Sequence, residues 1–312
     1  MRIEYHRTLI ADEVRNEAFY RALKAVIVPG VTRLADIGAG SGILGLMAAR
    51  LGAREVFFYE SAEVGAVTEA SIRATGLPGC HLFACHSTEM DDPPKVDVIV
   101  TETLGNYAFE EDILTTLDDA RRRMLKRGGT ILPRRVRQFT SPVVAARLHD
   151  ELSAWRRTGE RYGIDFRSAQ AMSFNNAYVR GMKPGDLLPG GTRQWDEVDL
   201  TARASGKRKG SATWAITEPA SIYGFAVWWE IEIADGITLS TAPDAPATHW
   251  EQLYFPVPRP MMVVSGETVE LRLSSATSPE GGTNLAWQAT HLAASGTVLA
   301  RQTMDLDKGY LP

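Results

Sequence analysis

The feature that most constrains the fold is an alternation of short apolar runs with longer amphipathic segments between residues 33 and 132. Residues 33–37, 55–59 and 96–100 form apolar runs with the length of buried strands. The segments between them, such as 42–51 and 63–75, carry apolar side chains at helical spacing. This alternation is typical of an α/β fold, in which helices cover both faces of a parallel sheet. Ligands of such folds bind beyond the carboxyl ends of the strands.

The same pattern extends on both sides of these elements. Residues 8–27 carry apolar side chains at helical spacing and stop before Pro29 and Gly30, which predicts an N-terminal helix. Further strands are predicted over residues 81–85 and 130–132, and a further helix over residues 110–125. Residues 1–133 are therefore interpreted as an N-terminal helix followed by a Rossmann-like ligand-binding domain.

A glycine-rich turn follows the first predicted strand and opens the next helix. It contains Asp36, Gly38, Gly40 and Gly42, and its glycines allow the backbone to pass close to a ligand. A dinucleotide-binding turn has the spacing G-x-G-x-x-G, whereas this turn has G-x-G-x-G, which suits a nucleoside without a pyrophosphate. Glu60 ends the second strand, where an acidic side chain can accept hydrogen bonds from both ribose hydroxyls. The turn and Glu60 together predict a nucleoside site.

The sequence pattern changes near Pro133. The following segments are rich in β-branched and aromatic residues and are punctuated by Gly, Pro, Asn and Asp, which predicts a mostly antiparallel β domain over residues 134–312, built as a barrel or a sandwich. Residues 149–190 fit neither pattern and are interpreted as a helical excursion from this domain. The predicted strands cover residues 213–217, 224–233, 251–257, 268–273, 285–292 and 298–304.

Composition excludes several classes of protein. The net charge of −4 argues against a nucleic-acid binder, which needs a basic face. Cys80 and Cys85 form no CxxC pair or His/Cys cluster, so no metal site is predicted, and the two thiols suit a reducing compartment. Neither a signal peptide nor an apolar run of membrane-spanning length is visible, so no membrane association and a cytoplasmic location are expected.

Three separated motifs resemble those of the protein arginine methyltransferases. After the fourth strand, Glu102 and Glu111 bracket a short loop with the spacing of that family's two paired glutamates. Residues 248–250 read Thr-His-Trp, and residues 6–15, His-Arg-Thr-Leu-Ile-Ala-Asp-Glu-Val-Arg, are similar to the family's helix over the cofactor. The resemblance spans nearly the whole chain. It implies a Rossmann-like S-adenosylmethionine-binding domain, a β-barrel domain with a helical dimerisation arm near residues 149–190, and a homodimer.

The resemblance also assigns roles to residues. Arg15 is expected to bind the methionine carboxylate of the cofactor, Glu60 the ribose, and Glu89 the adenine amine. Glu102 and Glu111 are expected to hold the guanidinium of arginine. Their two negative charges offset the approach of a guanidinium to a sulfonium cation. Three further side chains complete the implied site: Asp12 and His249, as a hydrogen-bonded pair that carries a proton away, and Trp250, which shapes the acceptor pocket.

The sequence departs from the family pattern around the acceptor. The family's aromatic Tyr-Phe segment, which folds over the cofactor, is absent before His6, and the usual pocket methionines are replaced by Leu9 and Ile113. Because these changes spare the chemical groups, the expected acceptor is free L-arginine or a small guanidino metabolite, with a protein arginine side chain as the alternative. Arginine outnumbers lysine, a bias typical of GC-rich genomes, which suggests a bacterial member of the family.

Two readings from other classes compete with this one. A nicotinamide-dependent oxidoreductase predicts G-x-G-x-x-G and gives no role to Glu102 or Glu111. A catalytically silent protein that only binds S-adenosylmethionine gives no reason for intact glutamates or for His249. The methyltransferase interpretation accounts for all of these residues.

Overall fold

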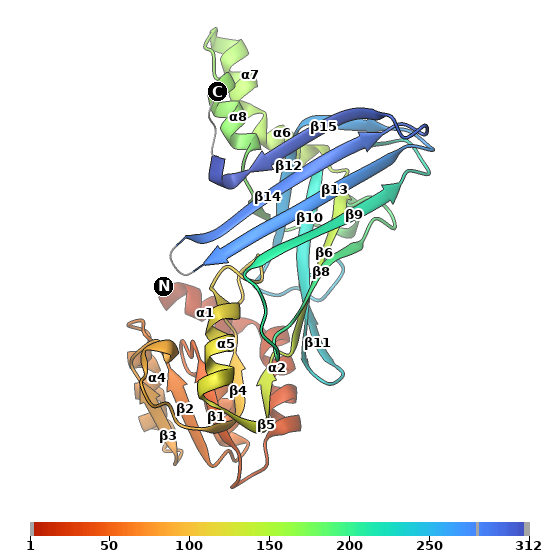
Figure 1. Cartoon of the computed structure of the whole chain (residues 1–312). Coiled ribbons are helices and arrows are strands. Elements are labelled where there is room, and N and C mark those ends of the chain that lie inside the picture. The colour runs from red at the N-terminus through yellow and green to blue at the C-terminus, as the bar shows by residue number, and fades with distance from the viewer. Residues whose placement is uncertain (1–2, 279–280, 309–312) are drawn as a thin grey trace.

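A computed structural model describes residues 3–278 and 281–308 (Figure 1). Its first part is a parallel sheet with the strand order β3-β2-β1-β4-β5, as the alternating pattern predicted. The apolar runs form β1 (Arg33–Ile37), β2 (Glu55–Tyr59), β3 (Cys80–Phe83), β4 (Val96–Thr101) and β5 (Leu125–Leu132). The helices between and after them are α3 (Ile43–Arg50), α4 (Gly65–Thr75), the short η1 (Ser87–Glu89) and α5 (Ile113–Arg123).

The N-terminal segment forms two helices, so the single helix predicted over residues 8–27 was wrong. Helix α1 spans Ile3–Ala11 and α2 spans Glu13–Val26. Asp12 lies between them as the N-cap of α2, because its carboxylate accepts a hydrogen bond from the Arg15 backbone N–H at 2.8 Å. The break turns α1 toward the cavity described below while α2 buries Phe19 and Leu23 in the core.

The rest of the chain contains two antiparallel sheets (Figure 1). One has the order β7-β12-β10-β6-β8, with β11 beside β10, and the other has the order β15-β14-β13-β9. The antiparallel β domain predicted from the second half of the sequence is therefore confirmed, and β6 and β8 are strands that the sequence pattern did not indicate. The bounds are β6 Arg135–Val143, β7 Tyr178–Arg180, β8 Arg193–Asp199, β9 Lys207–Ala215, β10 Ala220–Ala234, β11 Ile237–Ser240, β12 Gln252–Val263, β13 Thr268–Ser278, β14 Gly282–Leu292 and β15 Val298–Asp305.

Strand β10 is the central strand of the six-stranded sheet and is buried on both faces. Trp229 and Ile231 belong to the main core that the two parts of the chain share, whereas Trp228 packs in a second cluster with Leu148 and Phe174. Successive side chains of a strand point to opposite faces, so neighbouring tryptophans serve different cores. This double burial explains why β10 reads as an almost continuous apolar run.

The segment between β6 and β8 is mostly helical, as its weak periodicity indicated. It contains α6 (Ala146–Leu152), α7 (Ala154–Tyr162) and α8 (Arg167–Phe174), followed by β7 and the short η2 (Pro184–Asp186). We call α6–α8 the arm; Figure 1 shows α7 and α8 projecting away from both antiparallel sheets. A last short helix, η3 (Leu306–Lys308), follows β15. Within residues 3–278 and 281–308, no helix combines the length and the apolar character needed to cross a membrane.

Candidate active site

The register of the parallel sheet brings three predicted site residues to one edge. Ile37 of β1 pairs with Tyr59 of β2 and with Thr101 of β4. The residues that follow these three positions are Gly38, Glu60 and Glu102. Because the strands are parallel, all three leave the sheet at its carboxyl edge, where α/β folds bind ligands. The register of the parallel strands therefore brings these three residues together.

The glycine-rich turn is shaped so that its glycines are required. Gly38 and Gly40 have φ values of +69° and +57°, a region that other residues rarely adopt. A Cβ atom on Gly38 would lie 2.6 Å from Thr103 Cγ2, and one on Gly40 would lie 3.2 Å from the His6 ring. Glu60 fixes the turn, because its Oε2 accepts a hydrogen bond from the Gly40 backbone N–H at 2.8 Å. The turn, α1 and Glu60 therefore surround one space.

Gly42 and Asp36 support this turn from outside the cavity lining. Gly42 has a φ of +81° and precedes α3, with Thr68 packed against it. Asp36 is 1% exposed and accepts a hydrogen bond from the Gly45 backbone N–H at 2.8 Å. Burial raises the pKa of Asp36 to about 7, a shift that the hydrogen bond from Gly45 opposes. In this position Asp36 anchors the start of α3 rather than facing a ligand.

Glu89, which the resemblance assigned to the adenine amine, does not line the cavity. It is exposed at the end of η1 and accepts a hydrogen bond from the His86 backbone N–H at 3.1 Å, as half of a capping box. Ser87, two residues earlier, lines the cavity and is 1% exposed. Its hydroxyl has no hydrogen-bond partner among the described residues. Ser87 is thus better placed than Glu89 to meet a ligand.

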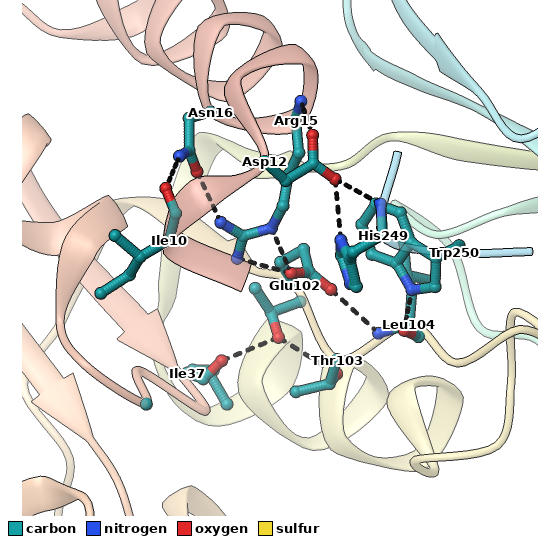
Figure 2. A network of polar contacts seen from close by, with 12 residues as sticks. Ile10, Asp12, Arg15, Asn16, Ile37, Glu102, Thr103, Leu104, His249 and Trp250 are labelled. Atoms are coloured by element: carbon teal, nitrogen blue, oxygen red, sulfur yellow. Dashed lines mark hydrogen bonds and ion pairs between the residues drawn. The ribbon is translucent and has the colours of Figure 1, made fainter. Parts of the chain in front are cut away.

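The two glutamates of the predicted clamp both line the same cavity. Glu102 Oε2 lies 2.5 Å from Arg15 Nη2, and the two side chains are only 4% and 5% exposed (Figure 2). The family resemblance assigned Arg15 to the methionine carboxylate and Glu102 to the guanidinium. In the structure the two side chains form a buried ion pair with each other. The neighbouring Glu110 turns into its own loop, where it accepts a hydrogen bond from the Tyr107 backbone N–H at 3.1 Å. Glu110 is absent from the cavity lining, so the loop geometry separates the two adjacent glutamates.

The electrostatic environment of Glu111 favours a positive ligand. Partial burial raises the pKa of Glu111, and the negative charges of Glu102, Glu110 and Glu60 raise it further. No described residue makes a hydrogen bond or an ion pair with its carboxylate. A cation placed between Glu102 and Glu111 would offset this repulsion.

The Thr-His-Trp segment holds the loop that follows β4. The indole N–H of Trp250 donates to the Leu104 carbonyl at 2.7 Å, and that of Trp229 donates to the Gly105 carbonyl at 3.0 Å. The Glu251 backbone N–H donates to Asn106 Oδ1 at 2.9 Å. Trp250 is 3% exposed and does not line the cavity, so its contribution is to fix the loop between the two glutamates.

Asp12 and His249 form the hydrogen-bonded pair that the resemblance implied. Asp12 Oδ2 lies 2.8 Å from His249 Nδ1 and also accepts the His249 backbone N–H at 2.8 Å (Figure 2). Burial raises the pKa of Asp12, but the hydrogen bonds from His249 and Arg15 outweigh it and leave the pKa below its usual value. An ionised Asp12 favours the tautomer in which Nδ1 carries the proton and Nε2 is an acceptor. His249 Nε2 is buried and has no partner among the described residues.

The cavity itself has a volume of about 250 Å³. Leu9 lines it, but Ile113 is fully buried in the core at the start of α5, so only one of the two predicted pocket residues faces it. Several lining residues could not be found from the sequence, because an isolated Tyr, His, Cys, Ser or Thr carries no signal without its neighbours in space. The missed lining residues include Tyr5, His6, Tyr59, Cys85, His86, Ser87 and Thr116.

Comparisons with known proteins agree with this geometry. Residues 137–288 match the family model described as the arginine methyltransferase oligomerization subdomain. Residues 20–134 match the model of the ribosomal protein L11 methyltransferase. An arginine N(omega)-methyltransferase from Streptomyces achromogenes subsp. streptozoticus is 32% identical over 287 residues, which cover 86% of this chain and 75% of that protein. The chain belongs to the arginine N-methyltransferase family.

Other members of the arginine N-methyltransferase family are similar in sequence and in structure. Protein arginine N-methyltransferase 6 of Xenopus tropicalis is 29% identical over 80% of this chain and 77% of its own length. The crystal structure of Arabidopsis thaliana protein arginine methyltransferase 10 superposes with a TM-score of 0.82 at 22% identity and covers 98% of both chains. The Trypanosoma brucei PRMT1 enzyme–prozyme heterotetramer with AdoHcy gives 0.86 at 18% identity, over 96% of this chain and 97% of that one. The predicted resemblance and fold class are confirmed.

Proposed function

We propose that this chain methylates the guanidinium of arginine with S-adenosylmethionine as methyl donor, and that free L-arginine or a small guanidino metabolite is its acceptor. The observation that carries the proposal is a single cavity lined by Gly38 and Glu60 at one side and by Glu102, Glu111 and His249 at the other. A nucleoside site and an anionic clamp with a hydrogen-bonded histidine therefore share one space.

The residues present fit the methyl donor. The turn at Gly38 and Gly40 leaves a cradle that a Cβ atom would fill, and Ser87 offers a buried hydroxyl without a partner among the described residues. Glu60 would hold the ribose with the acceptor capacity that its bonds to Gly40 and Ala62 leave free. When bound, S-adenosylmethionine supplies an electrophilic methyl group on sulfur and leaves as neutral S-adenosylhomocysteine.

The glutamates bind and orient the acceptor. A guanidinium carries five N–H donors in a planar fork, and two carboxylates can each accept charge-assisted hydrogen bonds from it. Arg15 holds Glu102 through one oxygen, so the other oxygen, which accepts the Leu104 N–H at 3.3 Å, has acceptor capacity left for the guanidinium. The clamp draws positive charge toward the held nitrogens, which leaves the lone pair of the remaining terminal nitrogen more available for attack.

A proton leaves the methylated nitrogen after the new C–N bond forms. His249 Nε2 can accept it, because Asp12 holds the Nδ1 proton and stabilises the imidazolium that results. Glu111 is a second acceptor, since its carboxylate lines the same cavity. Neither route needs a covalent intermediate on the protein.

Two observations support a small acceptor. The relative from Streptomyces achromogenes is named for arginine rather than for protein arginine. Tyr5 of α1 lies in the lining beside both glutamates, with its ring centroid 6.4 Å from that of His249, and narrows the space available to a peptide. The relatives named protein arginine N-methyltransferases favour the alternative acceptor, a protein side chain.

The deciding experiment offers labelled S-adenosylmethionine with either free L-arginine or an Arg-Gly-rich peptide, and reads the products by mass spectrometry. We expect methyl transfer to free arginine and little or none to the peptide. Transfer to the peptide alone would reverse the acceptor assignment, and transfer to neither would contradict the proposed reaction. Binding without turnover would favour the silent S-adenosylmethionine-binding protein.

We further propose that the chain forms a homodimer through the arm. The family model over residues 137–288 is described as an oligomerization subdomain and includes the arm. Tyr162, Ile164 and Met172 of this segment are 63%, 51% and 58% exposed, and dimerisation would bury such an apolar surface.

A further inference from the structure

A second and larger cavity lies between the arm and the four-stranded sheet. Its volume is about 1410 Å³, and none of the predicted site residues lines it. The arm contributes residues of α6–α8, including His149 and Arg156, and the sheet contributes residues of all four strands. Typical small-molecule sites occupy about 300–1,000 Å³, so this cavity can hold an organic ligand with room for water.

The floor of this cavity is one face of the sheet, as the strand register shows. One cross-strand row runs through Ser211, Arg272, Gln288 and Thr303, which pair with one another in that order. Cross-strand partners point to the same face, so all four side chains lie on the cavity side. A second row, two residues along each strand, runs through Lys209, Ser274, Ala286 and Asp305. The floor is therefore polar and carries Lys209 and Arg272 near its β9 edge.

The charge of the lining is positive, although the chain has a net charge of −4. Asp305 is already paired with Lys308 at 3.4 Å. Within residues 3–278 and 281–308, neither Lys209 nor Arg272 lies within ion-pair distance of a carboxylate. Arg167, another cation of the lining, pairs with Asp165 at 2.6 Å. Cations gathered in a concave site create a potential that attracts anions. The lining contains six basic residues, Arg156, Arg167, Lys209, Arg259, Arg272 and Lys308, and two acidic ones, Asp150 and Asp305.

The two walls are held together at one end. Asn175, just after α8, accepts the Asp305 backbone N–H through Oδ1 and donates to the Asp305 carbonyl through Nδ2, both at 3.1 Å. Phe174 and His149 pack beside this link with ring centroids 4.7 Å apart, and both line the cavity. The arm and the four-stranded sheet are thus linked by fixed contacts at the base of the arm, where the buried Phe174 and His149 rings pack against each other.

We propose that this cavity binds a phosphate-bearing anion with at least two negative charges, which bridges Arg156 of the arm to Lys209 and Arg272 of the sheet. The ligand class follows from the cations on both walls. A nucleoside phosphate and an inorganic polyphosphate share the required charge, and the test distinguishes them.

The test measures binding of guanosine triphosphate and of inorganic tripolyphosphate to the full chain by isothermal titration calorimetry. Saturating S-adenosylhomocysteine is present, so that neither probe enters the nucleoside site. We expect at least one probe to bind. The Lys209→Gln/Arg272→Gln double variant should bind it at least about tenfold more weakly, because two charge-assisted hydrogen bonds to the anion are lost. Equal affinity for the two probes would show that the phosphate groups alone are recognised, and tighter binding of guanosine triphosphate would show that the nucleoside contributes.

The matched control is Lys207→Gln/Arg301→Gln. It removes the same two charges from the neighbouring exposed surface of β9 and β15 without touching the cavity lining. This variant should bind the probes as the parent does. Failure of both probes to bind the parent would overturn the proposal. An equal loss in both double variants would also overturn it, because the effect would then come from net charge alone. Slower hydrogen exchange in α7 and α8 with bound ligand tests the bridging to the arm.

Discussion

At the scale of single residues, Arg15 connects the two halves of the candidate site. Its backbone N–H donates a hydrogen bond to Asp12 Oδ1, and its guanidinium forms an ion pair with Glu102 (Figure 2). A buried ion pair gives little net stability, because desolvation of both charges offsets their attraction. We infer that the pair is retained to hold the Glu102 side chain in place at the cavity. A variant that removes the charge of Glu102 and keeps its shape therefore tests its contribution to binding and turnover.

Replacement of Glu102 by Gln removes one negative charge and keeps the size of the side chain. We expect kcat to fall by about 10²–10³, the loss measured when one electrostatic contact to a transition state is removed. Steady-state kinetics with the parent acceptor measures it. The matched control is Glu110→Gln, whose side chain lies in the loop outside the cavity and should leave kcat close to that of the parent. Unchanged turnover of the Glu102 variant would refute the clamp.

Glu111 gives a prediction about pH. Its pKa is raised in the free protein by partial burial and by the neighbouring glutamates, so its ionised form destabilises the fold above the pKa of the unfolded chain. That cost is absent at low pH, where the carboxyl is protonated in both states, and is fully present above the folded pKa. Glu111→Gln should therefore raise the melting temperature at pH 8 but not near pH 4. A pH series of thermal melts without ligand checks this, and an equal gain at both pH values would contradict it.

At the scale of elements, the break between α1 and α2 positions half of the cavity. Asp12 ends one helix and begins the next, and its second oxygen holds both the backbone and the ring of His249, 237 residues later in the chain. The hydrogen bonds from Trp250 and Trp229 to the loop after β4 act in the same way. The site is thus assembled by contacts between the N-terminal helices, the parallel sheet and the antiparallel β domain.

Two substitutions of Asp12 separate its structural role from its chemical one. Asp12→Asn keeps an N-cap acceptor for α2 but loses the charge beside His249, so stability should change little while kcat falls. Asp12→Ala removes both the N-cap acceptor and the charge, and should also lower the free energy of unfolding by about 1 kcal/mol. Urea denaturation and initial rates, measured on both variants, test this split. Equal activity of parent and Asp12→Asn would exclude a role for the charged pair in proton removal.

At the scale of the whole molecule, the arm exposes apolar side chains that no other described part of its own chain covers. Figure 1 shows α7 and α8 projecting from the rest of the chain, and Tyr162, Ile164 and Met172 of this segment are exposed. A second copy that covers them would stabilise the arm by apolar burial. The proposed anion site lies between the same arm and the four-stranded sheet, and the variants that test the two proposals change different residues.

Tyr162→Asp/Ile164→Asp is expected to convert a dimer into a monomer, because it places two charges in an interface that would otherwise be apolar. Light scattering coupled to size-exclusion chromatography measures the mass. Val298→Asp/Leu299→Asp is the matched control, since these β15 residues are 47% and 52% exposed and lie outside the arm. A parent that is monomeric at assay concentrations would refute the homodimer proposal.

The sequence by itself determined the parallel sheet, the glycine turn, Glu60 and the antiparallel β domain, because each depends on local periodicity or on a backbone conformation that only glycine adopts easily. The family resemblance also implied Glu102, Glu111 and the Asp12–His249 pair. Only the tertiary structure decided that Arg15 pairs with Glu102, that Ser87 rather than Glu89 faces the cavity, and that Ile113 and Asp36 lie behind it. These outcomes depend on which side chains meet across elements distant in sequence, and burial and hydrogen bonding settle that only when the chain has folded.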